Sequence, residues 1–154
     1  MLSILRAAVL FLLGVSCDAS LNTTMNAMAA ASALAKQYYE QQTPLTGKGL
    51  CDHYIGVWYG LAHSGYTDAN AHWAATPGSY KLPGWEVGAL AFWLGGEHGH
   101  VAIGDEKLGH VYSTDYPKPL FVGHGSTDAV SAWVGSSYTF KGWYKPFFGK
   151  HGGL

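Results

Sequence analysis

A cysteine and a histidine, each placed where a regular element is expected to begin, are the residues of this chain best suited to chemistry. Cys51 follows the stretch GKGL, and His100 opens the apolar segment HVAIG. A thiolate attacks carbonyl carbons, and an imidazole commonly takes up and returns the proton. A thiol and an imidazole on separate elements are the minimal parts of a cysteine hydrolase.

The residues after Cys51 predict a helix over residues 51–63, because apolar side chains recur there every three or four positions. At the start of a helix, exposed amides and the dipole favour a thiolate, so we expect a thiol pKa below about 8.5. The same amides can donate to an oxyanion. The alternative is a buried, inert cysteine. Gly47 and Gly49 favour the nucleophile, because they let another chain approach closely.

The strand predicted over residues 100–105 gives His100 a direction. Val101 and Ile103 share one face, so His100 points to the other. If the helix of Cys51 packs on that other face, thiol and imidazole meet. His98 has the same parity and remains a rival base, although it lies in a glycine-rich stretch.

A third polar residue is expected across the hairpin that follows. A turn centred on residues 106–107, or one residue later, places His100 opposite Ser113 or Asp115. A carboxylate there would orient the imidazole and stabilise imidazolium. We therefore expect Asp115 as the third catalytic residue, with Ser113 as the alternative and a simple turn role for Asp115 as the competing interpretation.

The remaining histidines lack the spacing of a metal site, and phosphate-loop and dinucleotide signatures are absent from the sequence. We therefore expect neither a metal nor an organic cofactor. The histidines in question are His53, His63, His72, His110, His124 and His151.

The order of predicted elements indicates an α+β domain in which N-terminal helices pack on a small antiparallel sheet. Alanine and other helix formers predict a first helix over residues 24–41, which Pro44 ends. A short helical turn is expected around Trp73. Short apolar runs bounded by glycine predict strands over residues 88–93, 100–105, 110–115 and 142–148.

The first twenty residues have the pattern of a secretory signal peptide. Arg6 precedes an apolar run over residues 7–15, and small residues follow over 16–20. Cleavage would leave a secreted single domain, residues 21–154, in which Cys51 is the remaining thiol. The net charge of −1 and the 12% of charged residues argue against nucleic acid or stable membrane association as partners.

The chain resembles the CHAP and NlpC-type cysteine peptidases of the papain-like superfamily over about residues 45–145. The resemblance rests on a cysteine that opens a helix and on four later segments in the same order. These segments are PGWEVGALAFWLGG (83–96), GHVAI (99–103), VYSTD (111–115) and WVGSSYTFKGW (133–143).

The resemblance implies a papain-like fold and hydrolysis of an amide in bacterial peptidoglycan, either within the stem peptide or cross-bridge or at the muramoyl–L-alanine bond. Cys51 matches the nucleophile and His100 the general base, whereas Asp115 matches only the region of the third polar residue. Three alternatives stay open: a transpeptidase or transglutaminase-like acyltransferase, a non-catalytic cell-wall-binding protein, and a secreted effector with an inhibitor or immunity protein as partner.

Overall fold

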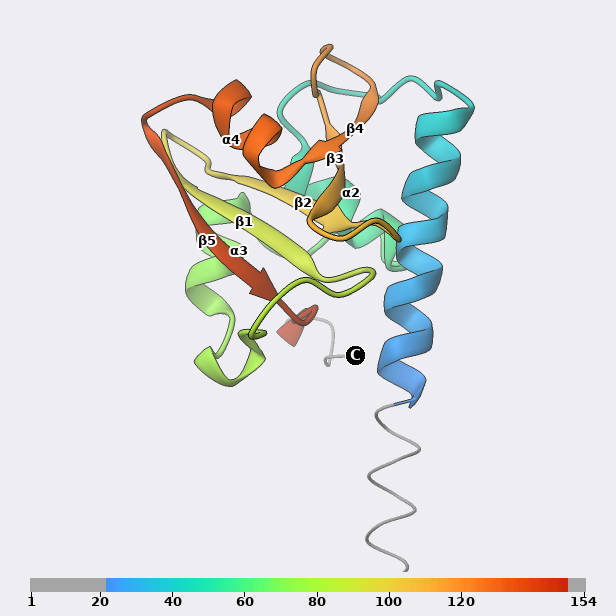
Figure 1. The fold of residues 1–154 in the computed structure, drawn as a ribbon, viewed down its shortest axis with the longest axis vertical. Helices are drawn as coiled ribbons and strands as arrows, with labels where there is room; N and C mark the ends of the chain where they lie inside the picture. Colours follow the sequence, from blue (N-terminus) through green and yellow to red (C-terminus); the bar gives the residue numbers. More distant parts are fainter. Residues whose placement is uncertain (1–21, 150–154) are drawn as a thin grey trace, which may run out of the picture.

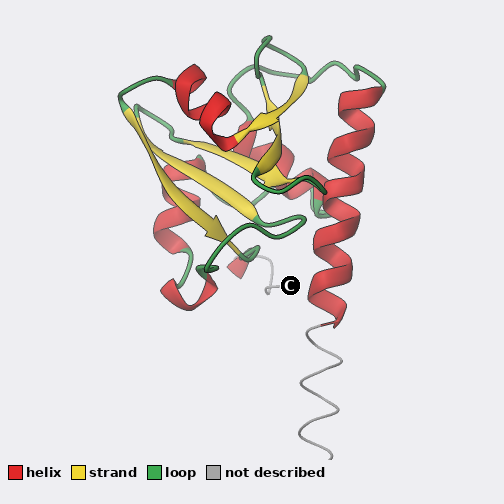
Figure 2. Ribbon diagram, in the orientation of Figure 1, coloured by secondary structure: helices red, strands yellow, loops and turns green. Residues whose placement is uncertain are grey.

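The computed structural model describes residues 22–149 as an α+β arrangement, shown in Figures 1 and 2. The predicted signal peptide and the first cysteine lie outside the described residues. A helix over residues 22–40 comes first. It is followed by α2 (Cys51–Trp58), α3 (Ala69–Ala75), the 3-10 helix η1 (Gly78–Tyr80), β1 (Leu90–Gly95), β2 (His100–Gly104), β3 (His110–Thr114), β4 (Val122–Ser126), α4 (Thr127–Val134) and β5 (Tyr138–Tyr144).

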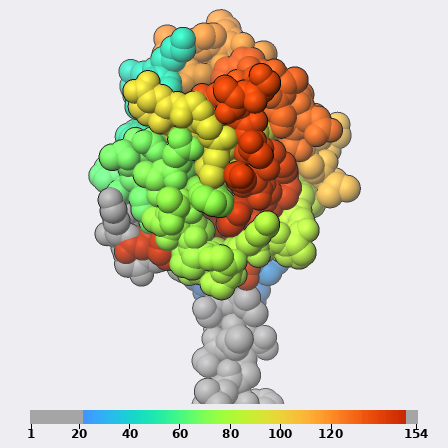
Figure 3. All heavy atoms as spheres, turned by 90° about the vertical axis from the view of Figure 1, so that its left-hand side faces the viewer, coloured from blue at the N-terminus to red at the C-terminus, as the bar shows by residue number. Residues whose placement is uncertain are grey.

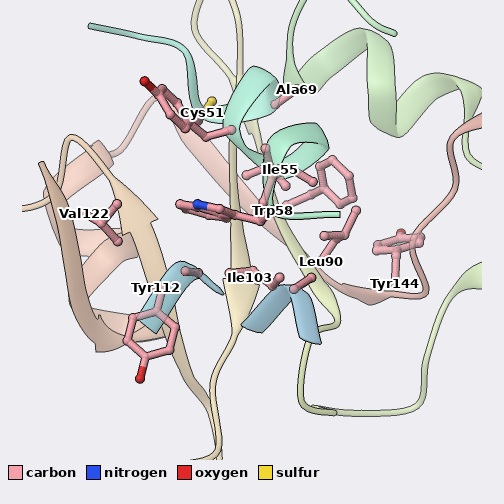
Figure 4. Close-up of a cluster of buried hydrophobic side chains, with 14 of the residues drawn as sticks. Cys51, Ile55, Trp58, Ala69, Leu90, Ile103, Tyr112, Val122 and Tyr144 are labelled. Atoms are coloured by element: carbon pink, nitrogen blue, oxygen red, sulfur yellow. The ribbon is translucent and has the colours of Figure 1, made fainter. Parts of the chain in front are cut away.

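The five strands form one antiparallel sheet in the order β4-β3-β2-β1-β5, and helices cover both of its faces. In Figure 1, α4 lies in front of the sheet, and α2 and α3 lie behind it. Val101 and Ile103 of β2 pack with α2, whereas Ala102 packs with Val130 of α4. This alternation is the period of two that a strand between two packed layers requires. Figure 4 shows Ile55 and Trp58 within the α2 layer, with Cys51 at its edge.

The helix over residues 22–40 packs along the side of this body through its alanines. Ala31 and Ala35 are buried, and the Ser32 hydroxyl donates a 2.8 Å hydrogen bond to the carbonyl of Gly104 at the end of β2. A methyl group on Gly88 would overlap the backbone of Met28, so the helix and the start of β1 approach too closely for any side chain. The first helix thus braces β1 and β2 at the ends away from His100.

The prediction that the second helix reaches His63 was wrong, because α2 ends at Trp58. Gly60 adopts a left-handed backbone with φ of 78°, and the amide of Leu61 bonds back to the carbonyl of Gly56. The chain then folds back so closely that a methyl group on Gly56 would overlap the backbone of His63 and Ser64.

The sequence prediction also omitted β4 and α4. Gly123 and Gly125 lower the strand propensity of β4, yet a side chain at Gly123 would overlap the backbone of Tyr116. For α4 a signal was present: the Ser126 hydroxyl accepts from the amide of Ala129, 3.1 Å away, as an N-cap does. The helix over residues 22–40, the turn around Trp73 and the predicted strands near β1, β2, β3 and β5 were confirmed, with bounds shifted by up to four residues at either end.

Among the described residues, no helix combines the length and the hydrophobicity that crossing a bilayer requires.

The close approach at Gly56 predicts a large effect of a single methyl group. Gly56→Ala should lower the free energy of unfolding by about 1–3 kcal/mol, because the new group meets backbone that cannot rotate away. Gly84→Ala is the matched control, since a methyl group there meets nothing within 4 Å. Urea unfolding of both variants measures the difference, and equal stabilities would contradict the close approach.

Candidate active site

Cys51 and His100 line the same cavity, which has a volume of about 470 Å³. Cys51 is the first residue of α2, and His100 is the first residue of β2. Both side chains are buried, with 7% of Cys51 and 6% of His100 exposed to solvent. The structure therefore brings together the two residues that the sequence singled out.

Cys51 and His100 line the cavity at the start of β2, and not on the face of the sheet where strand alternation predicted that they would meet. α2 packs on the face of Val101 and Ile103, opposite to the face that carries Ala102. The Cys51 sulfur nevertheless lies close to the backbone amide of Val101, the residue after His100. Cys51 and His100 are both first residues of their elements, so they can lie close together although α2 packs on the face of the sheet opposite to that of His100.

The partner of His100 within the sheet is Ser113. The Nε2 atom of His100 lies 2.8 Å from the Ser113 hydroxyl oxygen. That hydroxyl donates a longer bond of 3.4 Å to the carbonyl of Thr114, so it can accept from Nε2–H. This leaves Nδ1 of His100 unprotonated and able to accept the proton of a thiol. Ser113, named as the alternative third residue, holds the tautomer that a base needs.

Two tryptophans enclose the imidazole of His100. The ring of Trp93, which is buried in β1, lies 5.8 Å from that of His100, and the ring of Trp133 in α4 lies 5.6 Å away. The indole N–H of Trp93 donates a 2.7 Å hydrogen bond to Ser131, which ties α4 to the sheet. The sequence prediction missed Trp133 because it omitted α4, although the Ser126 cap could have indicated that helix.

Asp115 lines the cavity, but its carboxylate bonds to backbone amides. One oxygen accepts from Gly49 and the other from Leu120, each at 2.8 Å. Asp115 has a left-handed backbone with φ of 60°, which aspartate tolerates better than most residues. It thereby joins the loop before Cys51 to the loop after β3. The register Gly104↔Val111 continues to a pairing of His100 with Asp115, but the hydrogen bond to the imidazole comes from Ser113.

The electrostatics of the cavity keep the pair uncharged. The pKa of the Cys51 thiol is raised to about 12, chiefly by burial, and the amides of Val101 and Asp52 act in the opposite direction. Burial likewise lowers the pKa of His100 to about 4, against the raising effect of the Asp115 carboxylate. The expectation of a lowered thiol pKa was therefore wrong, because desolvation outweighs the helix start.

The rival base, His98, lies in the turn between β1 and β2. Its side chain is 62% exposed, and its nearest acidic partners are Glu97 at 3.7 Å and Asp68 at 3.9 Å. It also lines the cavity. In Figure 3 this turn, in yellow, lies on the surface between the green segment of α3 and the red-orange segment after α4.

The residue after the thiol, Asp52, belongs to a buried network that sequence reasoning missed. Its carboxylate accepts from Ser64 and lies 2.5 Å from Nδ1 of His72, whose Nε2 is 2.8 Å from the carbonyl of Phe147. The carbonyl of Phe147 can only accept, so Nε2 of His72 is the donor in that hydrogen bond. This network fixes the start of α2 to α3 and to the C-terminal segment. Its members are far apart in the sequence, and no spacing indicated it.

A second histidine–carboxylate pair, His124 with Asp105, lies at the hairpin of β2 and β3. It does not line the cavity of Cys51 and His100. Within residues 22–149, no group of three or more His, Cys, Asp or Glu side chains is arranged to hold a metal ion. The described part of the chain therefore offers no candidate metal centre.

Comparison of the chain with protein-family models, with curated proteins and with solved structures returned no match. The resemblance to papain-like peptidases therefore rests on the sequence segments that carry it.

The neutral pair predicts how the thiol reacts with an alkylating agent. The alkylation rate of Cys51 by iodoacetamide should keep rising with pH beyond 10, because the pKa of the thiol is raised to about 12. In urea the same cysteine should titrate near its ordinary pKa of about 8.5. A rate that reaches its plateau between pH 5 and 8 in the folded protein would instead indicate a resting thiolate–imidazolium pair.

Proposed function

We propose that the protein is a thiol-dependent hydrolase of amide bonds in bacterial peptidoglycan. The observation that carries this proposal is the cavity that Cys51 and His100 share, together with the hydrogen bond between Nε2 of His100 and the buried Ser113 behind it. The nucleophile, base and orienting group of an acyl-transfer site are then all present. Peptidoglycan as the substrate and the papain-like fold come from the sequence resemblance, and the secreted location that we assign comes from the signal-peptide pattern of residues 1–20.

The attack begins from the neutral pair. His100 takes the proton of Cys51 at Nδ1 as the sulfur bonds to the substrate carbonyl carbon, and Ser113 keeps the opposite nitrogen in place. The imidazolium that forms is favoured by the negative charge of Asp115, which already raises the pKa of His100. Asp115 acts here through space, since its oxygens are bonded to Gly49 and Leu120.

The start of α2 supplies donors for the oxyanion. The N-cap residue, Leu50, makes no side-chain hydrogen bond to the first turn, so the amides of Cys51 and Asp52 have no capping acceptor. The amide of Asp52 already contacts the sulfur. The imidazolium of His100 then protonates the leaving amine as the C–N bond breaks. Water, activated by neutral His100, hydrolyses the thioester and releases the acid and Cys51.

Digestion of purified peptidoglycan tests the activity. The mature protein should release soluble fragments with new amino termini, and Cys51→Ala should release none, because the nucleophile is gone. Mass spectrometry of the fragments identifies the bond that is cut. Circular dichroism of both proteins checks that Cys51→Ala is folded. Identical products from the two folded proteins would contradict the proposal.

Ser113 and Asp115 should differ in how they affect the reaction. Ser113→Ala should lower kcat by about tenfold with KM little changed, because one hydrogen bond to the base is lost. Asp115→Asn should lower kcat and, in addition, shift the acid limb of the pH profile of kcat/KM to lower pH, since the carboxylate of Asp115 raises the pKa of His100. Asp128→Asn is the control, because it makes the same substitution at an exposed aspartate in α4. Full activity and an unshifted profile in Asp115→Asn would remove it from the mechanism.

A further inference from the structure

Cys51 lines two cavities whose walls carry different side chains. The aromatic cavity is the one described above, and Trp133, Val134, Tyr138, Pro117 and Pro119 contribute to its walls. The polar cavity has a volume of about 620 Å³, and His53, His63, Tyr66, Thr67 and Asp68 contribute to its walls. Both cavities share Lys48, Gly49, Cys51 and His98 in their walls, so they adjoin at the residues around the thiol.

The aromatic cavity suits an uncharged group. Trp133 keeps 41% of its surface exposed while its ring contacts those of His100 and Tyr116, so part of a large apolar side chain is free to contact a ligand. The carboxylate of Asp115 in this cavity already binds two amides. Apart from the pair itself, its remaining charged or titratable groups are Lys48 and His98, in the part shared with the polar cavity, and the phenol of Tyr138.

The polar cavity suits a group that bears charge and hydrogen-bonding atoms. Its walls carry imidazole, phenol, hydroxyl and carboxylate groups. Asp68 caps α3 through one oxygen, 2.8 Å from the amide of Ala71, and its other oxygen lies 3.9 Å from Nδ1 of His98. Together with Lys48, these side chains can balance charge of either sign on a bound group.

The position of His100 indicates which half of the substrate binds in which cavity, because His100 lines only the aromatic cavity. The leaving nitrogen must lie within reach of His100 to receive its proton, whereas the acyl group extends to the other side of Cys51. We propose that the leaving amine belongs to an uncharged, apolar residue that binds against Trp133, and that the acyl half carries the charged groups and binds in the polar cavity. This inference rests on the proposed function and narrows its substrate class.

The amines released from peptidoglycan test the direction of binding. New amino termini should belong to uncharged residues such as alanine or glycine, and charged residues should be on the acyl side. Trp133→Ala should lower kcat/KM about tenfold, as expected for loss of an aromatic contact. Tyr39→Ala is the matched control, because Tyr39 is 37% exposed and lines neither cavity. New amines on diamino residues, or equal rates for the two variants, would overturn the inference but not the hydrolase activity.

A binding measurement separates the inference from the activity. In Cys51→Ala, alaninamide should shift the indole resonance of Trp133, identified by its loss in Trp133→Phe, and a glutamyl peptide amide should shift it at least tenfold less at equal concentration. If alaninamide shifts the Trp133 resonance but the unsubstituted protein leaves peptidoglycan intact, the proposed function fails and the subsite assignment stands. If peptidoglycan is cut but alaninamide causes no shift, the subsite assignment fails and the proposed function stands.

Discussion

Desolvation of the thiol and the imidazole is the constraint on which the site depends. Cys51 and His100 are each the first residue of their element, and the body of the protein buries both. Burial penalises the charged form of each group, so the pKa of the acid rises and that of the base falls. In the mechanism that we propose, charge therefore forms during attack, where the amides of α2 and the carboxylate of Asp115 can stabilise it.

The surrounding structure fixes the positions of Cys51 at the start of α2 and His100 at the start of β2. Asp52, next to the thiol, is fixed by His72, and the loop before the thiol is fixed by Asp115. On the other side, the bond between Trp93 and Ser131 keeps α4 over His100. Each contact joins segments that are distant in the sequence. The position of the sulfur relative to the imidazole is thus set by the whole domain and not by the helix alone.

The sequence allowed prediction of those parts that follow from local pattern. Periodicity placed a helix start at Cys51 and a strand at His100, and hairpin spacing limited the third residue to Ser113 or Asp115. It could not show that His72 pairs with Asp52 or that Trp133 reaches His100, because these contacts depend on how separate segments dock. The thiol pKa was mispredicted for the same reason: a helix start is visible in a sequence, but the burial that outweighs it is not.

The resting state of Cys51 also bears on how the protein endures oxidising surroundings. Peroxides and disulfides react with thiolates, and a cysteine whose sulfur stays protonated at neutral pH is oxidised slowly. Enclosure by Val101 and the body of α2 further limits access to the sulfur. In the secreted hydrolase that we propose, a cysteine that stays protonated at rest can therefore persist where no reducing system would repair it.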